Sequence, residues 1–197
     1  MKAMRSALAS ALLLASGCIS SPSPSQHLFA LPTSPPTGQT DQVGSLEGRT
    51  LGFGPVSVAS HLDRAFIAIR RNDALYEFAD SLRWAAPVEA LVQERLVAAL
   101  VWATGANDVR PFPWASTRPP DVQVSAHLIR FEVGPDGSAD LLAGWFIRDG
   151  ATRSLLSSGT FTRHEPVDGA SAQGAVEALD RALISFALEL ARQIPSS

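Results

Sequence analysis

The pattern of apolar and polar residues first predicts a bent strand and a hairpin. The segment 49–60, RTLGFGPVSVAS, is apolar, punctuated by glycine and without a helical period, so we expect a strand with a bend at Gly54–Pro55. Two further apolar segments, 65–71 and 74–80, flank an Asn-Asp pair that suits a tight turn. This arrangement predicts a β-hairpin.

Three more strands are predicted further along the chain. In DVQVSAHLIRFEV, residues 121–133, apolar residues alternate first in one phase and then in the opposite one, which predicts a bulge near Leu128–Ile129. The turn GPDGSA then leads into DLLAGWFIRDG, and a turn at its end leads into ATRSLLSSGTFTRH. Consecutive strands joined by short turns predict an antiparallel meander.

Two segments carry the helical period. The segment 83–105 repeats apolar residues at three- and four-residue steps, with Pro87 expected in the first turn and the end at Gly105. The segment 171–194 has one apolar stripe, which must cover another surface. The order strands, helix, strands, helix predicts a mixed α/β fold over residues 49–195, a single, largely antiparallel sheet packed against two main helices.

The chain begins with the layout of a secretory signal peptide. Residues 1–17 contain two basic residues, an apolar run of about nine residues and a pair of small residues. The run is too short for a transmembrane helix, which needs roughly 20 residues. Cys18 follows and is the only cysteine, which excludes an internal disulfide and a cysteine-based metal site.

The stretch around Cys18 resembles the lipobox of bacterial lipoproteins. This resemblance implies that Cys18 is lipidated, becomes the first residue after cleavage, and anchors the protein to a membrane through its acyl chains. The alternative is that Cys18 is only a small apolar residue near an ordinary cleavage site.

Residues 18–48 are rich in Ser, Pro, Thr and Gly and predict a tether without a core of its own. Within it, HLFALP at 27–32 is a small apolar island and a candidate edge strand. If this island docks on the domain, the free segment 19–26 spans roughly 25 Å at ~3.1 Å per residue. The domain would then lie close to its membrane.

The charge of the exported chain argues against nucleic acid as a partner. Loss of residues 1–17 leaves 14 basic and 19 acidic residues, a net charge of −5. Such a surface has no general attraction for phosphate backbones. The apolar fraction of 46% is sufficient for one domain with a real core.

No catalytic, cofactor-binding or metal site is predicted. The histidines lie far apart, and none belongs to an HxxxH or HExxH spacing. No GxSxG elbow, SxxK pair or phosphate-binding glycine loop is present. We therefore expect a protein that is not an enzyme, although a pair of carboxylates formed only in space would escape this search. The histidines are His27, His61, His127 and His164.

The tryptophans divide into two groups. Trp102 and Trp145 lie on segments with apolar periodicity and are predicted to fill the core. Trp114 lies with Phe112 in the proline-rich connection PFPWASTRPP, where an exposed apolar patch can contact a partner or a membrane. Phe112 and Trp114 are therefore candidate partner-facing residues, with core filling as the alternative.

Two short motifs carry a resemblance to a known family. One, LDR, precedes the predicted hairpin, and the other, RWAAPV, opens the first predicted helix. Their defining residues are Leu62, Asp63, Arg64, Arg83, Trp84 and Pro87. With both motifs in this order, the chain resembles the auxiliary lipoproteins of ABC-type transport systems, the family of the paraquat-inducible lipoprotein. We expect the motifs to be structural, with Trp84 buried at a helix entrance and Arg83 holding backbone or carboxylate groups.

The resemblance implies an accessory subunit of a transporter for lipids or other hydrophobic molecules. The implied partner is a mammalian-cell-entry (MCE) domain protein, energised by a permease and an ATPase, and members of this type can assemble into homo-oligomeric rings. The implied location is the outer membrane, facing the periplasm. A stand-alone lipid- or ligand-binding lipoprotein with its own cavity and an envelope hydrolase are the alternatives.

Overall fold

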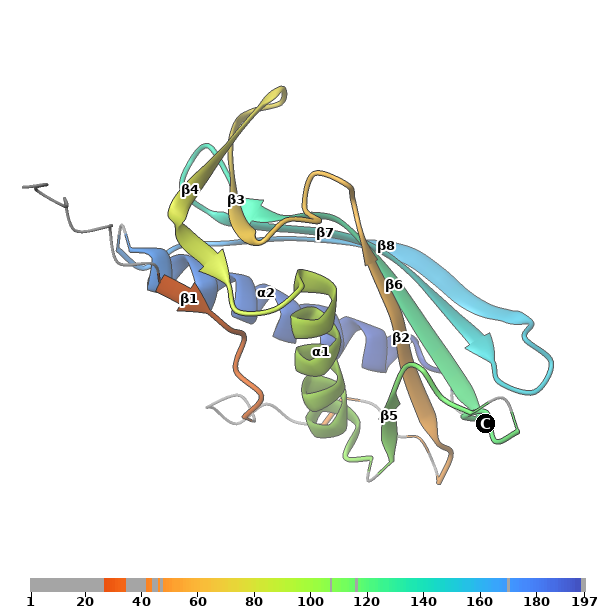
Figure 1. Cartoon of the computed structure of the whole chain (residues 1–197). Helices are drawn as coiled ribbons and strands as arrows, with labels where there is room; N and C mark the ends of the chain where they lie inside the picture. Colours follow the sequence, from red (N-terminus) through yellow and green to blue (C-terminus); the bar gives the residue numbers. More distant parts are fainter. Residues whose placement is uncertain are drawn as a thin grey trace, which may run out of the picture.

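One curled sheet and two helices make up the fold (Figure 1). The computed structural model describes residues 27–34, 42–43, 46, 48–106, 108–115, 117–169 and 171–195, so the predicted leader and Cys18 lie outside it. The strands are β1 (His27–Phe29), β2 (Leu51–Val58), β3 (Phe66–Asn72), β4 (Leu75–Trp84), β5 (Val109–Pro111), β6 (Val122–Val133), β7 (Ala139–Asp149) and β8 (Leu155–Glu165). The helices are α1 (Val88–Thr104) and α2 (Ala172–Gln193), and both lie against the same face of the sheet. The predicted mixed α/β fold is confirmed.

The sheet is organised around β6. One edge of β6 pairs in parallel with β2 over Val122–Leu128 and with β3 at Val133, and its other edge pairs with β7 in antiparallel fashion. β8 continues the antiparallel ladder, β5 lies beyond β2, and β4 and β1 lie beyond β3. The predicted meander β6–β7–β8 is confirmed and supplies the two longest ladders. The pairings β1–β4, β2–β5, β2–β6 and β3–β6 are parallel and make the sheet mixed.

Two irregularities lie where the sequence pattern changes. The register between β2 and β6 shifts around the cis Gly54–Pro55 bond, and the register between β6 and β7 shifts between Leu128 and Arg130. The second shift inserts an extra residue into β6. Leu128 and Phe131 are three positions apart and would face opposite sides of a regular strand, but the extra residue allows both to be buried. Both predicted bends are confirmed.

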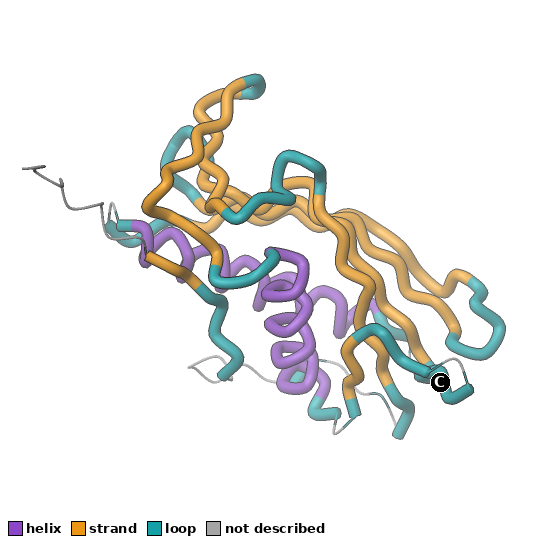
Figure 2. Tube along the Cα trace, in the orientation of Figure 1, coloured by secondary structure: helices purple, strands orange, loops and turns teal. Residues whose placement is uncertain are grey.

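The predicted hairpin is formed by β3 and β4 and projects from one end of the sheet (Figure 2). In its turn, the backbone amide of Ala74 donates to Oδ1 of Asn72 at 2.9 Å, which is the local bond that suits asparagine to turns. β4 continues to Trp84, beyond the predicted end at residue 80.

Both helices are bounded by the expected signals, with one difference. α1 ends at Gly105, whose φ of 63° is left-handed. Pro87 precedes the helix instead of lying in its first turn, because its ψ of 134° is extended and helical geometry begins at Val88. At the start of α2, the amide of Gly174 donates to Oγ of Ser171 at 3.0 Å.

Two short edge strands complete the sheet. β1 occupies the first three residues of the predicted 27–32 segment and pairs with the end of β4. β5 was not expected, because its segment was interpreted only as a proline-rich connection. It pairs in parallel with the start of β2, with Leu51 opposite Val109. The sequence of a three-residue segment carries no pattern that would indicate such a distant partner.

Two buried ion pairs join distant elements, in addition to the buried carboxylate of Glu165, which is bound by Arg163 and Arg181. Between the helices, Arg95 of α1 is only 1% exposed, forms a bidentate pair with Asp180 of α2, and donates to the carbonyl oxygen of Ser34 at 2.9 Å. At the base of the hairpin, Arg70 donates to Glu132 at 2.6 Å and to Asp140 at 2.5 Å. Each pair joins elements far apart in sequence.

Asp121 joins the starts of β2 and β6. Its Oδ2 accepts hydrogen bonds from the amide and the hydroxyl of Thr50, at 2.7 and 2.8 Å, and these bonds hold the pKa of Asp121 below its usual value of 3.8. Since the folded pKa is lowered, the ionised carboxylate stabilises the fold above the unfolded pKa. That contribution is lost as the pH falls through the folded pKa.

We expect Asp121→Asn to lower the free energy of unfolding at pH 7 by about 0.5 to 1 kcal/mol, a value kept small by the exposure of both groups. The difference from the wild type should shrink as the pH falls from 5 towards 2. Urea unfolding at a series of pH values measures it, with Asp63→Asn, an exposed carboxylate elsewhere, as the control. A difference that stays constant with pH would contradict the assignment.

Candidate functional site

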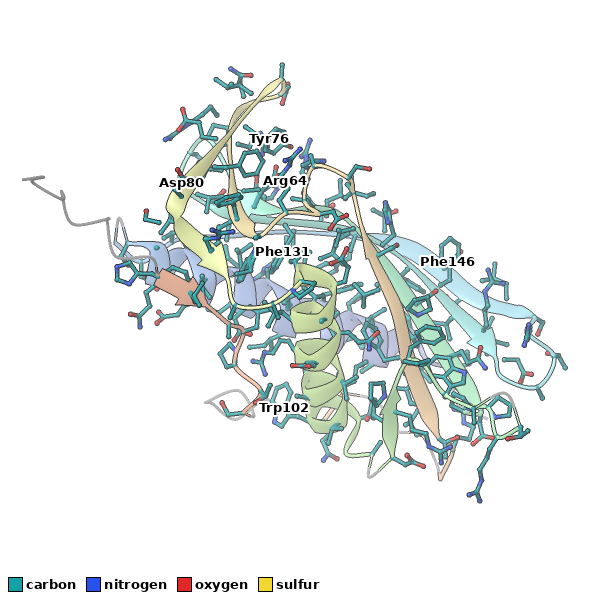
Figure 3. The ribbon with its side chains drawn as sticks, viewed as in Figure 1. Arg64, Tyr76, Asp80, Trp102, Phe131 and Phe146 are labelled. Carbon is teal, nitrogen blue, oxygen red and sulfur yellow. The ribbon has the colours of Figure 1, made fainter. Side chains whose placement is uncertain are left out.

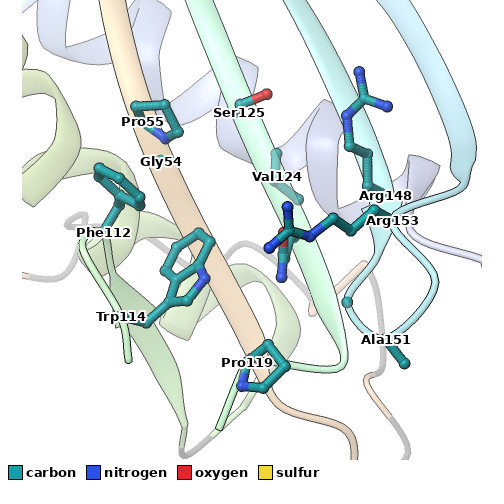
Figure 4. Close-up of a pocket in the computed structure, with 12 residues that line it drawn as sticks. Gly54, Pro55, Phe112, Trp114, Pro119, Val124, Ser125, Arg148, Ala151 and Arg153 are labelled. Carbon is teal, nitrogen blue, oxygen red and sulfur yellow. The ribbon is translucent and has the colours of Figure 1, made fainter. Parts of the chain in front are cut away.

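A pocket of about 440 Å³ opens at the end of the sheet where β2, β5 and β6 begin (Figure 4). Phe112 and Trp114, which follow β5, form one wall, and Arg148 and Arg153 face them from the other side. β6 supplies Val124 and neighbouring residues between the two walls. The candidate partner-facing aromatics of the sequence therefore lie together at one open pocket.

The aromatic wall is fixed to the sheet by its backbone. The amide of Phe112 donates to the carbonyl oxygen of Phe53 at 2.9 Å, and Nε2 of Gln93 on α1 donates to the carbonyl oxygen of Phe112 at 2.8 Å. The rings of Phe112 and Trp114 meet edge to face, with centroids 5.2 Å apart. The Phe112 side chain stays 40% exposed, so the wall is held in place without being covered.

Gly52 allows Trp114 to lie directly on β2. A Cβ atom at this glycine would lie 2.9 Å from Cζ3 of the indole ring, closer than packed carbon atoms approach. The same Cβ atom would lie 2.4 Å from Cγ of Pro120, so a side chain at position 52 would have to displace both the Pro120 ring and the Trp114 indole.

The basic wall comes from β7 and the turn that follows it. Asp149 shapes this turn, because its Oδ1 accepts a hydrogen bond from the amide of Thr152 at 2.7 Å. This hydrogen bond lowers the pKa of Asp149. Arg153 has a left-handed φ of 60° and donates its amide to the carbonyl oxygen of Asp149 at 2.9 Å. Within the described part of the chain, neither Arg148 nor Arg153 lies within ion-pair distance of a carboxylate.

The residues of the RWAAPV motif lie away from this pocket. Trp84 is 5% exposed and stacks on Phe131, with centroids 5.8 Å apart. Arg83 places its guanidinium 4.7 Å from the centroid of Phe66 in a cation–π contact, and among the described residues it has none of the backbone or carboxylate partners that we expected. Pro87 precedes α1, as described above.

The LDR motif packs around the hairpin. Leu62 is buried, whereas Asp63 and Arg64 are exposed, and the Arg64 guanidinium lies 5.6 Å from the centroid of Phe78. Figure 3 shows Arg64 beside the β3–β4 hairpin and Phe131 on the helix side of the sheet. Both motifs thus contact the core or the hairpin, and neither contributes to the pocket.

Two of the histidines, far apart in the sequence, approach the same buried cluster, because His61 lies near Glu132 and His164 near Asp140, the two carboxylates that Arg70 joins. His127 lies on the exposed side of β6 against Ser57 at 2.9 Å, His164 lies 2.7 Å from Asp140, and His61 lies 3.7 Å from Glu132. Among the described residues, no group of three or more His, Cys, Asp or Glu side chains is placed to hold a metal ion.

Sequence reasoning missed the two arginines of the pocket and the buried Arg70. Arg148 alternates with buried neighbours on β7, a pattern typical of any solvent-facing residue. Arg70 lies in the polar run RRND, which suits a hairpin end and gives no sign of its partners Glu132 and Asp140. Only the register of the sheet brings these groups together.

Comparison with known families identifies the chain. The sequence model of the family described as ABC-type transport auxiliary lipoprotein component matches residues 29–191. The chain belongs to this family. No curated protein sequence matches it at a significant level.

Solved structures support the fold of this auxiliary lipoprotein. A Xanthomonas campestris protein, XCC0632, assigned to the DUF330 family, is 17% identical over 85% of this chain and 90% of its own, with a TM-score of 0.66. An uncharacterized protein is 19% identical over 87% of this chain and 99% of its own, with a TM-score of 0.71. A PelC dodecamer from Paraburkholderia phytofirmans, 15% identical over 74% and 91%, reaches a TM-score of only 0.44, which is too low to bear on the assembly of this chain.

Family membership confirms the resemblance predicted from the two motifs. It assigns the chain an accessory role in ABC-type transport and a lipoprotein character, in a family not known for catalysis. Neither described helix is long and apolar enough to cross a membrane.

Proposed function

We propose that this auxiliary lipoprotein is anchored through Cys18 in the outer membrane, faces the periplasm, and serves an MCE-type system that moves lipids or other hydrophobic molecules across the envelope. The observation that carries the proposal is the match of residues 29–191 to the auxiliary lipoprotein family. The lipobox-like stretch before Cys18 supports the anchor. The open aromatic pocket supports a protein contact, because an exposed apolar surface beside polar groups is typical of an interaction site.

Co-purification tests the partner. The native lipoprotein is extracted from membranes in mild detergent and captured through a tag at its C-terminus, and the proteins retained with it are identified by mass spectrometry. We expect the MCE-domain protein to be retained. Its absence under conditions that preserve the permease and ATPase complex would contradict the proposed role. Mass measurement of the captured protein would at the same time report any homo-oligomeric ring.

A stand-alone lipid-binding lipoprotein is the second candidate, and one observation favours it. A pocket of about 650 Å³ near the start of α2 is lined by Ile67, Ile69, Leu82, Val133 and Val167 among others. Native mass spectrometry of the purified protein separates the two functions, since a stand-alone binder is expected to carry acyl-chain lipids and to purify without an MCE-domain protein.

Cys18→Ser tests the anchor. Without the thiol no acyl chain can be attached, so we expect the protein either to move to the soluble fraction or to keep its uncleaved leader. Cell fractionation and the mass of the mature N-terminus measure this, with Ser16→Ala as the control. Normal processing together with unchanged membrane association of Cys18→Ser would contradict lipidation at this residue.

A further inference from the structure

We propose that the pocket between Trp114 and the two arginines binds an extended acidic peptide segment of a protein partner. In this arrangement a carboxylate lies between Arg148 and Arg153, and a neighbouring apolar side chain packs against Phe112 and Trp114. The inference rests on the proposed function in that it assigns a site to the partner of the transport system.

The first argument is the charge of the pocket. Both arginines line the pocket opposite the aromatics, and Figure 4 shows the Arg153 side chain directed across it towards Trp114, whereas the Arg148 side chain runs along the sheet and its guanidinium lies 5.6 Å from the centroid of Phe146. Within the described part of the chain, no carboxylate lies within ion-pair distance of either guanidinium group. A guanidinium group matches a carboxylate with two parallel hydrogen bonds, so the pair selects an anionic ligand. This local positive charge occurs in a chain whose formal net charge is −3.

The second argument is the combination of apolar and polar surface. The edge-to-face pair of Phe112 and Trp114 offers a rigid apolar surface that is held by the backbone and by Gln93. Between the walls, the side chains of Gln123 and Ser125 make no hydrogen bond to other described residues. These two groups can bond to the backbone of a peptide, so the pocket provides what an acidic and apolar segment requires.

The third argument separates a peptide from a lipid. The pocket of about 440 Å³ is open, and its apolar wall of Phe112 and Trp114 faces a polar wall that carries two arginines, so the lining offers no continuous apolar channel for an acyl chain. Its position points the same way. It surrounds residues 123–125 of β6, whereas β3, which leads to β4 and β1, pairs with β6 at Val133.

On β6, the pocket residues around Val124 and the β3 partner Val133 are nine residues apart, which corresponds to ~30 Å along the strand. Figure 1 shows β1 and β5 on opposite sides of the molecule. Because the tether enters the domain at β1, a chain anchored at Cys18 carries the pocket on the part farthest from the anchor. A ligand arriving there is one that approaches from the periplasm, as a partner protein does.

The test uses the detergent-solubilised lipoprotein and a fluorescein-labelled peptide in which Glu alternates with Phe and Leu. A second peptide carries Lys in place of Glu, and phosphatidylglycerol vesicles serve as the anionic lipid. We expect the wild type to bind the acidic peptide at least tenfold more tightly than the lysine peptide, with an affinity that falls as salt is added. We expect Arg148→Glu/Arg153→Glu to lose at least tenfold, and Trp114→Ala to lose binding without changing the salt dependence.

Arg64→Glu/Arg130→Glu is the matched control, because it changes the net charge equally at residues away from the pocket. Both arginines of the pocket are exposed, so the melting temperature of the double variant should remain that of the wild type. Equal binding by the wild type and Arg148→Glu/Arg153→Glu would overturn the site. Arginine-dependent binding of vesicles in place of the peptide would also overturn it, in favour of a lipid headgroup.

The peptide measurement and the co-purification fail independently. If the MCE-domain protein is retained by the wild type and equally by Arg148→Glu/Arg153→Glu, the proposed function stands and the site is wrong. If the acidic peptide binds in an arginine-dependent manner but no MCE-domain protein is retained, the site stands and the identity of the partner is wrong.

Discussion

Asp180→Leu is expected to lower the free energy of unfolding by about 3 to 5 kcal/mol, because it leaves the Arg95 guanidinium buried without a counter-charge. Arg95 is 1% exposed, and two of its nitrogen atoms contact the carboxylate of Asp180. The remaining bond to the Ser34 carbonyl oxygen cannot neutralise the charge. Urea unfolding followed by circular dichroism measures the loss.

The double variant Arg95→Met/Asp180→Leu is the informative control. Replacing both members of a buried ion pair by apolar residues of similar size is often nearly neutral, so the double variant should be more stable than Asp180→Leu alone. This order of stability would show that the loss comes from the uncompensated charge. A single variant as stable as the wild type would mean that Arg95 reaches solvent when Asp180 is absent, contrary to its burial in the structure.

Trp84→Ala is expected to cost roughly 3 to 5 kcal/mol of unfolding free energy, because it removes a large buried ring and leaves a cavity beside Phe131. Trp84 is 5% exposed, and its amide donates to the carbonyl oxygen of Ala65 at 2.8 Å, so the backbone holds the ring between β4 and the entrance of α1. The same urea unfolding measures the loss.

Phe146→Ala is the matched control for this variant, since Phe146 is also aromatic and lies on a strand but is 44% exposed. We expect its effect to stay within about 0.5 kcal/mol. Near-wild-type stability of Trp84→Ala would instead assign Trp84 to an interface that the isolated chain leaves open.

The elements that depend on local pattern could be predicted from the sequence. The change of phase at Leu128–Ile129 predicted the bulge of β6 because a strand must turn alternate side chains to one face. Gly105 marked the end of α1 because a left-handed residue is needed there. The parallel pairing of β2 with both β5 and β6 could not be predicted, since it joins segments that are about 60 to 70 residues apart by backbone bonds that any side chain permits.

The sequence predicted the aromatic half of the candidate site and missed the basic half. Phe112 and Trp114 stood out because aromatic residues in a proline-rich connection have no periodic face to bury. Arg148 and Arg153 did not, because an arginine on a strand or in a turn is ordinary. The two arginines belong to the pocket because Gln123 of β6 pairs with Arg148 of β7, which brings the basic wall opposite the aromatic one.

The position of β1 determines how the domain would respond to force. Among the described strands, β1 pairs with β4 alone, by the register pairs His27–Leu82, Leu28–Arg83 and Phe29–Trp84. If the chain is held at Cys18 as proposed, a pull from a partner at the pocket acts along this short parallel ladder in shear. β1 would then detach from β4 first and lengthen the tether, while Trp84 and the rest of the sheet remain folded.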